Sequence, residues 1–223
     1  APQTVYSDHF LETQPLAGAI GYKLEAPPIH PVIFASTLPG YGREQSDLLA
    51  QFAKTHALLA LLRDGFHEQS PGGRVTLRDD GSPLLDYPLN DFVMDGARRA
   101  FLSMAEIQFA AGATAVLPVH EMARRYASWK EAREAIAALT MQPLLTRVVS
   151  AHVMGGCGMA ADERRGVLRP DGTHWQIANL SVHDGSIFPT SIGANPQLSI
   201  YAIVNRLATQ LALRLGAAAV TLA

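Results

Sequence analysis

The residues best suited to chemistry lie in the last third of the chain. His152 precedes a glycine-rich turn, Gly155-Gly156, where the absence of side chains lets the backbone approach a flat or bulky molecule closely. A neutral imidazole accepts a proton near neutral pH, which suits a general base. Alone, the histidine is a weak signal, because the chain has eight histidines and an isolated one is more often a surface or core residue.

A second block, Leu180–Pro189, has the pattern of a strand that runs into a turn at Asp184-Gly185. Backbone amides in such a turn can approach a ligand where glycine removes the side chain. The simpler interpretation is an ordinary hairpin turn, because Asp and Gly are common turn residues.

The third block contains Asn195-Pro196, a pair typical of a helix start, since asparagine caps helices and proline is favoured at the first helical position. A helix start presents unpaired N–H groups and the positive end of the helix dipole, which stabilise negative charge. The simpler alternative is that Asn195 only caps its own helix.

In this order and spacing, the three blocks resemble the carboxy-terminal signature of the glucose-methanol-choline (GMC) family of FAD-dependent oxidoreductases. The resemblance implies a flavoenzyme that oxidises an alcohol CH–OH group to a carbonyl, with hydride transfer to FAD N5. It covers about residues 147–214. Tyr6–Phe10 and Lys23–Pro28 are similar to the branch of long-chain alcohol oxidases and dehydrogenases.

The resemblance also implies residue roles. His152 is similar to the family's catalytic base, and Asn195 to the partner that hydrogen-bonds the alcohol oxygen. The implied flavin-binding residues come from the second and third blocks: Asp184, Gly185, Ser186, Asn195, Pro196 and Gln197. The family block usually continues Gly-Thr-Cys-Arg-Met-Gly, whereas Gly156 and Gly158 replace the threonine and arginine here. This departure concerns local hydrogen bonds near the flavin rather than His152.

The dinucleotide-binding half of the family has no counterpart in the chain. Gly40–Gln45 lacks the third glycine of the Rossmann fingerprint and follows Pro39, so we expect a loop there. The chain begins without methionine or a signal sequence, which is typical of a cut or processed end. We expect residues 1–145 to form a substrate domain and residues 146–223 the signature segment with its terminal helix. The FAD-binding half would then come from the rest of the same protein or from a partner chain.

The amino-acid composition limits which classes of protein and which binding partners are consistent with this chain. The 223 residues are 48% hydrophobic and carry a net charge of -2, which is ordinary for a globular protein and gives no basic surface for nucleic acid. No apolar run reaches the roughly 18 residues of a membrane-spanning helix. The single cysteine mildly favours a reducing, cytoplasmic compartment. No pair of histidines has metal-ligand spacing, so we expect no metal.

Two other function classes are open. Cys157, His152 and Asn195 have the residue types of a cysteine hydrolase, in which an imidazole and an amide assist a thiolate. That hypothesis leaves the Asp184 block unexplained. The chain could also be a non-catalytic substrate-recognition or interaction domain that retains the motifs for packing. An enzyme differs from such a domain in whether the His152 and Asn195 side chains converge on one open cleft or point into separate cores.

The elements that must position these residues indicate an α+β fold, mainly an antiparallel sheet backed by helices. Residues 1–45, including Val32–Ala35, have the pattern of strands and loops. Asp79–Ser82 is a turn that suits a β-hairpin. The predicted helices are Leu48–Leu62, Asn90–Ala111, a segment that starts at the Ser128 capping box and ends at Ala138, and Ile200–Leu215. Apolar residues between Leu24 and Leu62 indicate either a core or an alcohol substrate with hydrophobic bulk.

Overall fold

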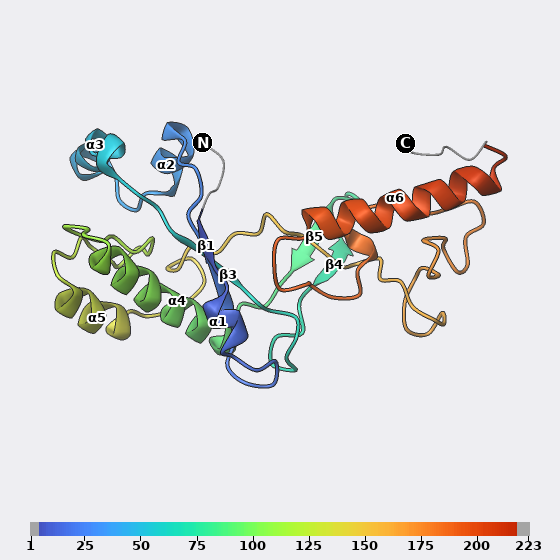
Figure 1. Ribbon diagram of the computed structural model, residues 1–223, viewed down its shortest axis with the longest axis horizontal. Coiled ribbons are helices and arrows are strands. Elements are labelled where there is room, and N and C mark those ends of the chain that lie inside the picture. The colour runs from blue at the N-terminus through green and yellow to red at the C-terminus, as the bar shows by residue number, and fades with distance from the viewer. Residues whose placement is uncertain (1–4, 218–223) are drawn as a thin grey trace. The chain divides into compact units, whose positions relative to one another are not determined.

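The computed structural model describes residues 5–217, which divide into two compact units. The first unit contains the described residues up to Gly72 together with Pro88–Val149. The second contains Gly73–Tyr87 together with the described residues from Ser150 onward. Figure 1 shows the elements of both units in chain order. The division into domains near residue 145 stays a prediction.

The first unit is built on a three-stranded antiparallel sheet. Its strands are β1 (Tyr6–Ser7), β2 (Tyr22–Glu25) and β3 (Leu59–Leu62), in the order β1-β2-β3. Tyr22 pairs with Leu62 across the inner pair of strands. Tyr22 and Leu24 lie on one face, because side chains alternate along a strand, and both are buried. This face therefore belongs to the core of the unit.

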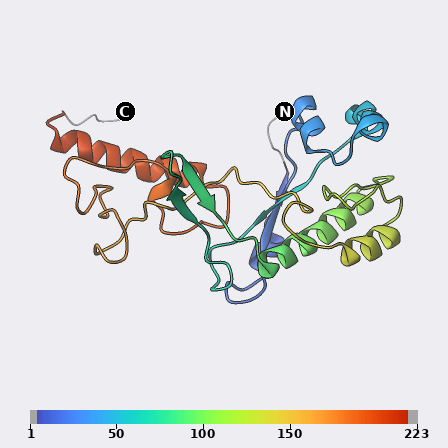
Figure 2. The same cartoon turned by 180° about the vertical axis from the view of Figure 1, so that it is seen from behind.

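One helix covers this core and a second helix packs against the first, as Figure 2 shows from the reverse side. Helix α4 (Asp91–Ala110) contacts β2, β3 and helix α5 (Trp129–Ala138). Both helices start at a side-chain cap: the Asn90 side chain accepts from the Val93 N–H, and Ser128 Oγ accepts from the Glu131 N–H at 3.2 Å. These caps satisfy N–H groups that have no acceptor within the helix. The predicted helix positions are confirmed for both.

Three predictions for the early part of the chain are wrong. Val32–Ala35 lies in helix α2 (Pro31–Thr37), which Pro31 starts and which His30 caps by accepting from the Val32 N–H. A proline at the first helical position fixes φ for the helix, and this local start signal outweighs the strand propensity of the β-branched residues.

The helix expected at Leu48–Leu62 lies earlier and is shorter. Helix α3 spans Gly42–Ala50 and is followed by a 3-10 turn, η1 (Phe52–Lys54), so most of Gly40–Gln45 is helical rather than a loop. Leu59–Leu62 forms β3 because pairing with β2 satisfies its backbone groups. A short helix, α1 (His9–Glu12), completes the unit.

The second unit contains the predicted hairpin and the terminal helix. Strands β4 (Arg74–Leu77) and β5 (Pro83–Asp86) pair antiparallel, and Gly81 in the turn has φ +80°. The rest is helix α6 (Gln197–Arg214), the 3-10 turn η2 (Gly185–Ile187) and long irregular segments. One face of the hairpin carries exposed apolar residues, such as Val75 opposite Leu85.

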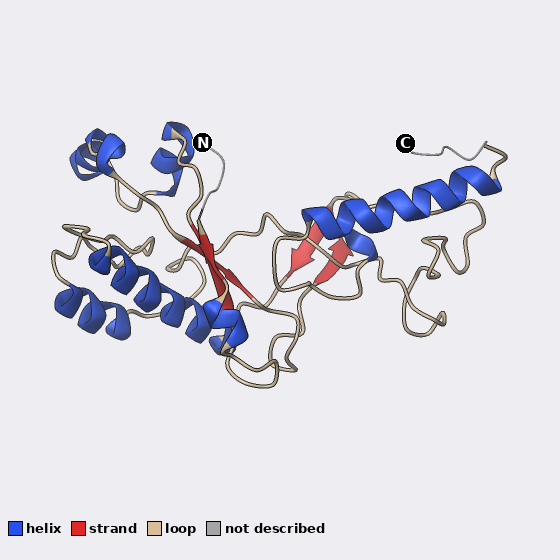
Figure 3. Cartoon of the chain, viewed as in Figure 1, coloured by secondary structure: helices blue, strands red, loops and turns tan. Residues whose placement is uncertain are grey.

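The fold class is confirmed as α+β, with antiparallel strands and separate helices (Figure 3). The sheets have three and two strands, so the sheet is a smaller part of the structure than the sequence predicted. Within residues 5–217, no helix combines the length and the hydropathy that crossing a bilayer requires.

Candidate functional site

The block that contains His152 is an irregular segment of the second unit, and backbone hydrogen bonds join it to the Asp184 block. The Gly155 N–H donates to the Gly185 carbonyl at 3.2 Å, and the Cys157 N–H donates to the Ser186 carbonyl at 2.9 Å. A third bond continues this ladder two residues further on, from Met159 to Ile187 at 2.9 Å. The first and second sequence blocks therefore lie side by side.

The turn at Asp184 is confirmed, whereas the strand expected before it is reduced to a single bridge between Thr173 and Ser181. Asp184 Oδ1 accepts from the Ser186 N–H at 2.7 Å. This closes a local turn of the kind that Asp side chains favour over a strand. Hydrogen bonding to Ser186 lowers the pKa of the exposed Asp184 carboxyl, so the carboxylate is charged at neutral pH.

The third block approaches the second through α6. A Cβ atom on Gly185 would be 3.0 Å from Ile200 Cδ1 and 3.1 Å from the Val153 carbonyl oxygen. A side chain at this position would force Ile200 or the Val153 carbonyl to shift, so glycine favours this close approach. Gly185 is thus where the His152 block, the Asp184 turn and the first turns of α6 meet.

The start of α6 differs from the prediction by one residue. The helix begins at Gln197, and Pro196 occupies the capping position in place of Asn195. The Pro196 carbonyl accepts the first helical bond from the Ile200 N–H at 2.9 Å, but a proline side chain cannot accept from the N–H groups of the first turn. Asn195 and Gln197 are exposed beside this end. The first turn of α6 therefore presents backbone donors toward its surroundings.

The His152 imidazole is half-buried and makes no hydrogen bond, ion pair or ring contact with another residue in the range 5–217. Its ring nitrogens are therefore available to an external group. Cys157 packs against the apolar cluster that contains Ile187 and Leu207. The His152 imidazole makes no hydrogen bond with Cys157, and a cysteine hydrolase needs an imidazole beside its thiol, so this alternative loses support.

The two cavities described in the structure lie elsewhere, in the first unit. They adjoin one another along Glu44 and Leu48 of α3, with volumes of about 80 and 260 Å³. Neither is lined by a residue of the three blocks. His152 and Asn195, the candidate catalytic residues, lie in the second unit, so these cavities are not the candidate site. Among residues 5–217, no group of three His, Cys, Asp or Glu side chains is arranged to hold a metal ion.

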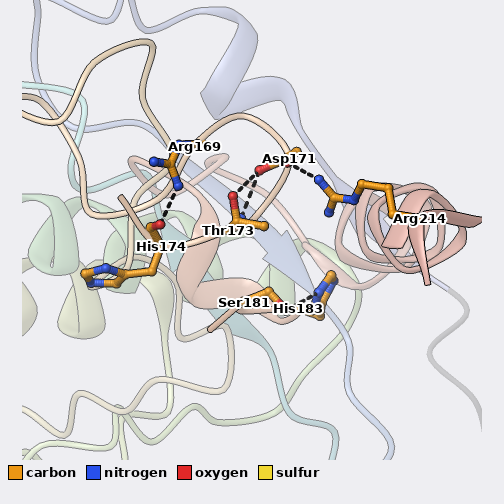
Figure 4. Close-up of polar contacts among 7 residues, drawn as sticks. All are labelled: Arg169, Asp171, Thr173, His174, Ser181, His183 and Arg214. Atoms are coloured by element: carbon orange, nitrogen blue, oxygen red, sulfur yellow. Dashed lines mark hydrogen bonds and ion pairs between the residues drawn. The ribbon is translucent and has the colours of Figure 1, made fainter. Parts of the chain in front are cut away.

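Sequence reasoning missed a polar network in the second unit (Figure 4). Asp171 Oδ1 accepts from the Thr173 N–H at 3.0 Å and from Thr173 Oγ1 at 2.6 Å, while Asp171 Oδ2 accepts from Arg214 at the end of α6. Arg169 donates to the backbone carbonyls of His174 and Trp175. The sequence Pro170-Asp-Gly indicates a turn, but nothing local identifies Arg214 as its partner.

A separate polar contact lies beside the Asp184 turn. His183 Nε2 lies 3.0 Å from Ser181 Oγ. His183 Nδ1 is buried and lacks a hydrogen-bond partner within the described part of the chain. The Arg169 guanidinium carbon also lies over the Trp175 ring, 4.6 Å from its centroid.

Comparisons with known proteins point to one family. A family model described as GMC oxidoreductase matches residues 69–203. A long-chain-alcohol oxidase of Arabidopsis thaliana is 29% identical over 188 residues, which cover 81% of this chain and 25% of that protein. A second long-chain-alcohol oxidase of this plant is 30% identical, and the match covers 79% of this chain and 24% of that protein. The chain thus spans about a quarter of the length of these relatives.

Two further similarities are more limited. A cholesterol oxidase of Acinetobacter baumannii is 40% identical over 57 residues, which cover 26% of this chain and 10% of that protein. A solved structure of a formate oxidase variant from Aspergillus oryzae matches with a TM-score of 0.47 and 19% identity, over 86% of this chain and 31% of that chain.

Proposed function

The chain belongs to the GMC oxidoreductase family, and from this premise we propose that it forms part of a flavin-dependent enzyme that oxidises an alcohol to a carbonyl compound. The observation that carries the proposal is the backbone ladder between the Gly155–Met159 segment and the Gly185–Ile187 turn. This ladder brings together two blocks that belong to one signature although they are almost 30 residues apart in sequence.

The residues present fit FAD as the cofactor. The first turn of α6 has no side-chain cap and offers backbone N–H groups, which suit the electron-rich edge of a flavin ring. A Cβ atom on Gly156 would have nothing within 4 Å, so there is open space beside the His152 block. We assign the flavin contacts to Asp184, Gly185, Ser186, Asn195, Pro196 and Gln197. When bound, FAD supplies the acceptor for the hydride that the alcohol carbon loses.

We assign removal of the hydroxyl proton to His152 and orientation of the alcohol to Asn195. His152 accepts the hydroxyl proton, because its half-buried imidazole has no competing partner in the described residues. Asn195 is exposed at the start of α6, where its amide would hydrogen-bond the alcohol oxygen and orient the reacting C–H bond. Removal of the proton raises the negative charge on oxygen and so favours loss of the hydride.

The relatives support a proposal for the substrate and for the partner. We propose an alcohol with hydrophobic bulk, because two Arabidopsis relatives are long-chain-alcohol oxidases. The FAD-binding half would be supplied by a further part of the same protein or by a partner chain, because the matches cover a quarter of the relatives and no Rossmann fingerprint occurs here. No basic surface is expected for nucleic acid at a net charge of -2.

The test is the visible absorption spectrum of the full-length protein, recorded without oxygen before and after addition of a long-chain primary alcohol. Flavin bands that bleach on addition are expected, and a short polar alcohol serves as the matched comparison for substrate class. A full-length protein that purifies without flavin, and that cannot be reconstituted with FAD, would contradict the proposal.

A further inference from the structure

Three contacts along α6 share one face of the helix. Ile200 lies against Gly185, Leu207 lies against Gly172, and Arg214 pairs with Asp171. The three helix residues are spaced by seven, and residues at i, i+7 and i+14 lie near one face because seven residues make nearly two turns. One face of α6 therefore packs against Gly185 and Gly172 and pairs with Asp171.

The glycines set how closely the helix approaches. A Cβ on Gly172 would be 3.2 Å from Leu207 Cδ1 and 3.2 Å from the Val182 carbonyl oxygen. Gly172 also has φ +80°, which side-chain-bearing residues rarely adopt. A larger residue at this position would press on the side chain of Leu207, the most buried residue of α6, and would adopt a strained backbone conformation.

The ion pair between Asp171 and Arg214 fixes the position of α6 along the helix axis. One Asp171 oxygen is held by the N–H and hydroxyl groups of Thr173, so the other oxygen points in a fixed direction toward Arg214. The Gly172 N–H donates to the Arg169 carbonyl at 2.9 Å, which closes the turn around this aspartate. A rigid acceptor that binds the last residue of the helix resists sliding and rotation of α6.

The turn is also tied to the Asp184 block. The Val182 N–H donates to the Gly172 carbonyl at 3.0 Å, two residues before Asp184. A single turn thus contacts both the segment that leads into the Asp184 turn and the far end of α6. The start of α6 is about 26 Å from Arg214 at 1.5 Å per residue.

We propose that the Asp171–Thr173 turn is a positioning element of the active site: it fixes α6 against the Asp184 turn and so places Asn195 and Gln197 relative to His152. The inference rests on the proposed function for its effect on catalysis. Asp171, Gly172 and Arg214 lie beyond the signature blocks, and they act through the helix rather than on the substrate.

The experiment compares Asp171→Ala and Arg214→Ala with Asp162→Ala in the full-length protein. Asp162 is an exposed aspartate of the same unit whose Oδ1 accepts from the Arg164 N–H at 3.0 Å, so it forms a similar local turn without a contact to α6. Asp171→Ala and Arg214→Ala should each lower kcat about 10-fold with KM within about 2-fold, because a displacement of the reacting groups by about 1 Å costs about 100-fold and a smaller one costs less. Arg214→Lys, which keeps the charge, should recover part of the loss.

A second readout does not depend on turnover. Hydrogen exchange of the Ile200–Val204 amides, the first of which donates to the Pro196 carbonyl, should be about 10-fold faster in Asp171→Ala and Arg214→Ala than in wild type, and unchanged in Asp162→Ala, because a loosened helix opens more often. Equal kcat and equal exchange in all three alanine variants would overturn the inference. A wild-type protein with neither flavin nor alcohol turnover would remove the proposed function, while the exchange comparison would still test the positioning of α6.

Discussion

Gly185 and Ile200 are in contact across the junction of two sequence blocks, and a methyl group on Gly185 would come within 3.0 Å of Ile200 Cδ1. The Val153 carbonyl oxygen closes the other side at 3.1 Å. Because one of these neighbours is backbone, the junction cannot relax by a side-chain rotation alone. The distance between the Asp184 turn and α6 is therefore set by the absence of a side chain at residue 185.

Replacement of Gly185 by alanine should destabilise the protein by about 1–3 kcal/mol, the usual cost of overpacking. Gly158→Ala is the matched control, since its Cβ would meet Pro189 at an ordinary 3.4 Å and its φ lies outside the left-handed region. Urea unfolding of both variants measures the difference. Equal free energies of unfolding for the two variants would contradict the prediction, because they would show that Ile200 and the Val153 carbonyl shift to accommodate the methyl group.

Replacement of His152 by alanine should lower turnover about 100- to 10,000-fold, the range that a positioned base contributes, and should leave FAD content close to that of wild type. His56→Ala serves as the control, because His56 is exposed and lies in the first unit. Steady-state rates are normalised to bound flavin in each preparation. A His152→Ala holoenzyme with full activity would remove this residue from the mechanism.

The Asp171 carboxylate should remain charged throughout the physiological range. Hydrogen bonds from Thr173 and the adjacent Arg214 lower its pKa from 3.8 to about 2. A lowered folded pKa contributes stability that is complete above the unfolded pKa and is lost as the pH falls through about 2. The stability difference between wild type and Asp171→Asn should thus be constant between about pH 5 and 8 and shrink below about pH 4.

Urea unfolding at a series of pH values measures this difference. Asp162→Asn provides the comparison for loss of an exposed aspartate that has no Arg214 partner. A difference that varies between neutral pH and pH 5 would indicate that another titrating group controls this turn.

Gly96 in the second turn of α4 is in contact with Ile20, so an alanine there would clash with the Ile20 Cγ2 methyl group. Gly96→Ala should destabilise the first unit by about 3 kcal/mol through overpacking, although alanine favours a helix over glycine by about 1 kcal/mol. The Ile20→Ala/Gly96→Ala double variant should be less destabilised than the sum of the single variants. Additive free energies of unfolding would contradict the direct contact.

Local signals predict several elements correctly because their cause lies within a few residues. The Ser128 side chain caps α5, and Glu131 Oε2 reaches back to the Ala127 N–H at 3.2 Å, one residue before the expected donor. Asn90 caps α4 in the same way, and the Asp79–Ser82 turn closes the hairpin. Caps and turns depend on side chains that bond to their own neighbourhood, so the sequence is sufficient to find them.

The predictions that fail depend on contacts that a local pattern does not contain. Leu59–Leu62 has apolar residues that fit a helix, but it forms β3 because β2 offers a partner along its whole length. The sequence predicts Asn195 as the cap of α6, whereas the helix starts after Pro196. Apolar runs of four or five residues fit both helix and strand, and the choice falls to whichever neighbour satisfies the backbone.

The sequence by itself determined the family, through three blocks in a fixed order, and with it the residues to which we assign chemistry. Tertiary structure alone decided that the first two blocks share a backbone ladder and that Gly185, Gly172 and Asp171 receive one face of α6. The physical reason is sequence separation: Asp171 and Arg214 are 43 residues apart, and no local propensity relates a turn to the end of a distant helix. Their pairing exists only because the core around Leu207 brings the two segments together.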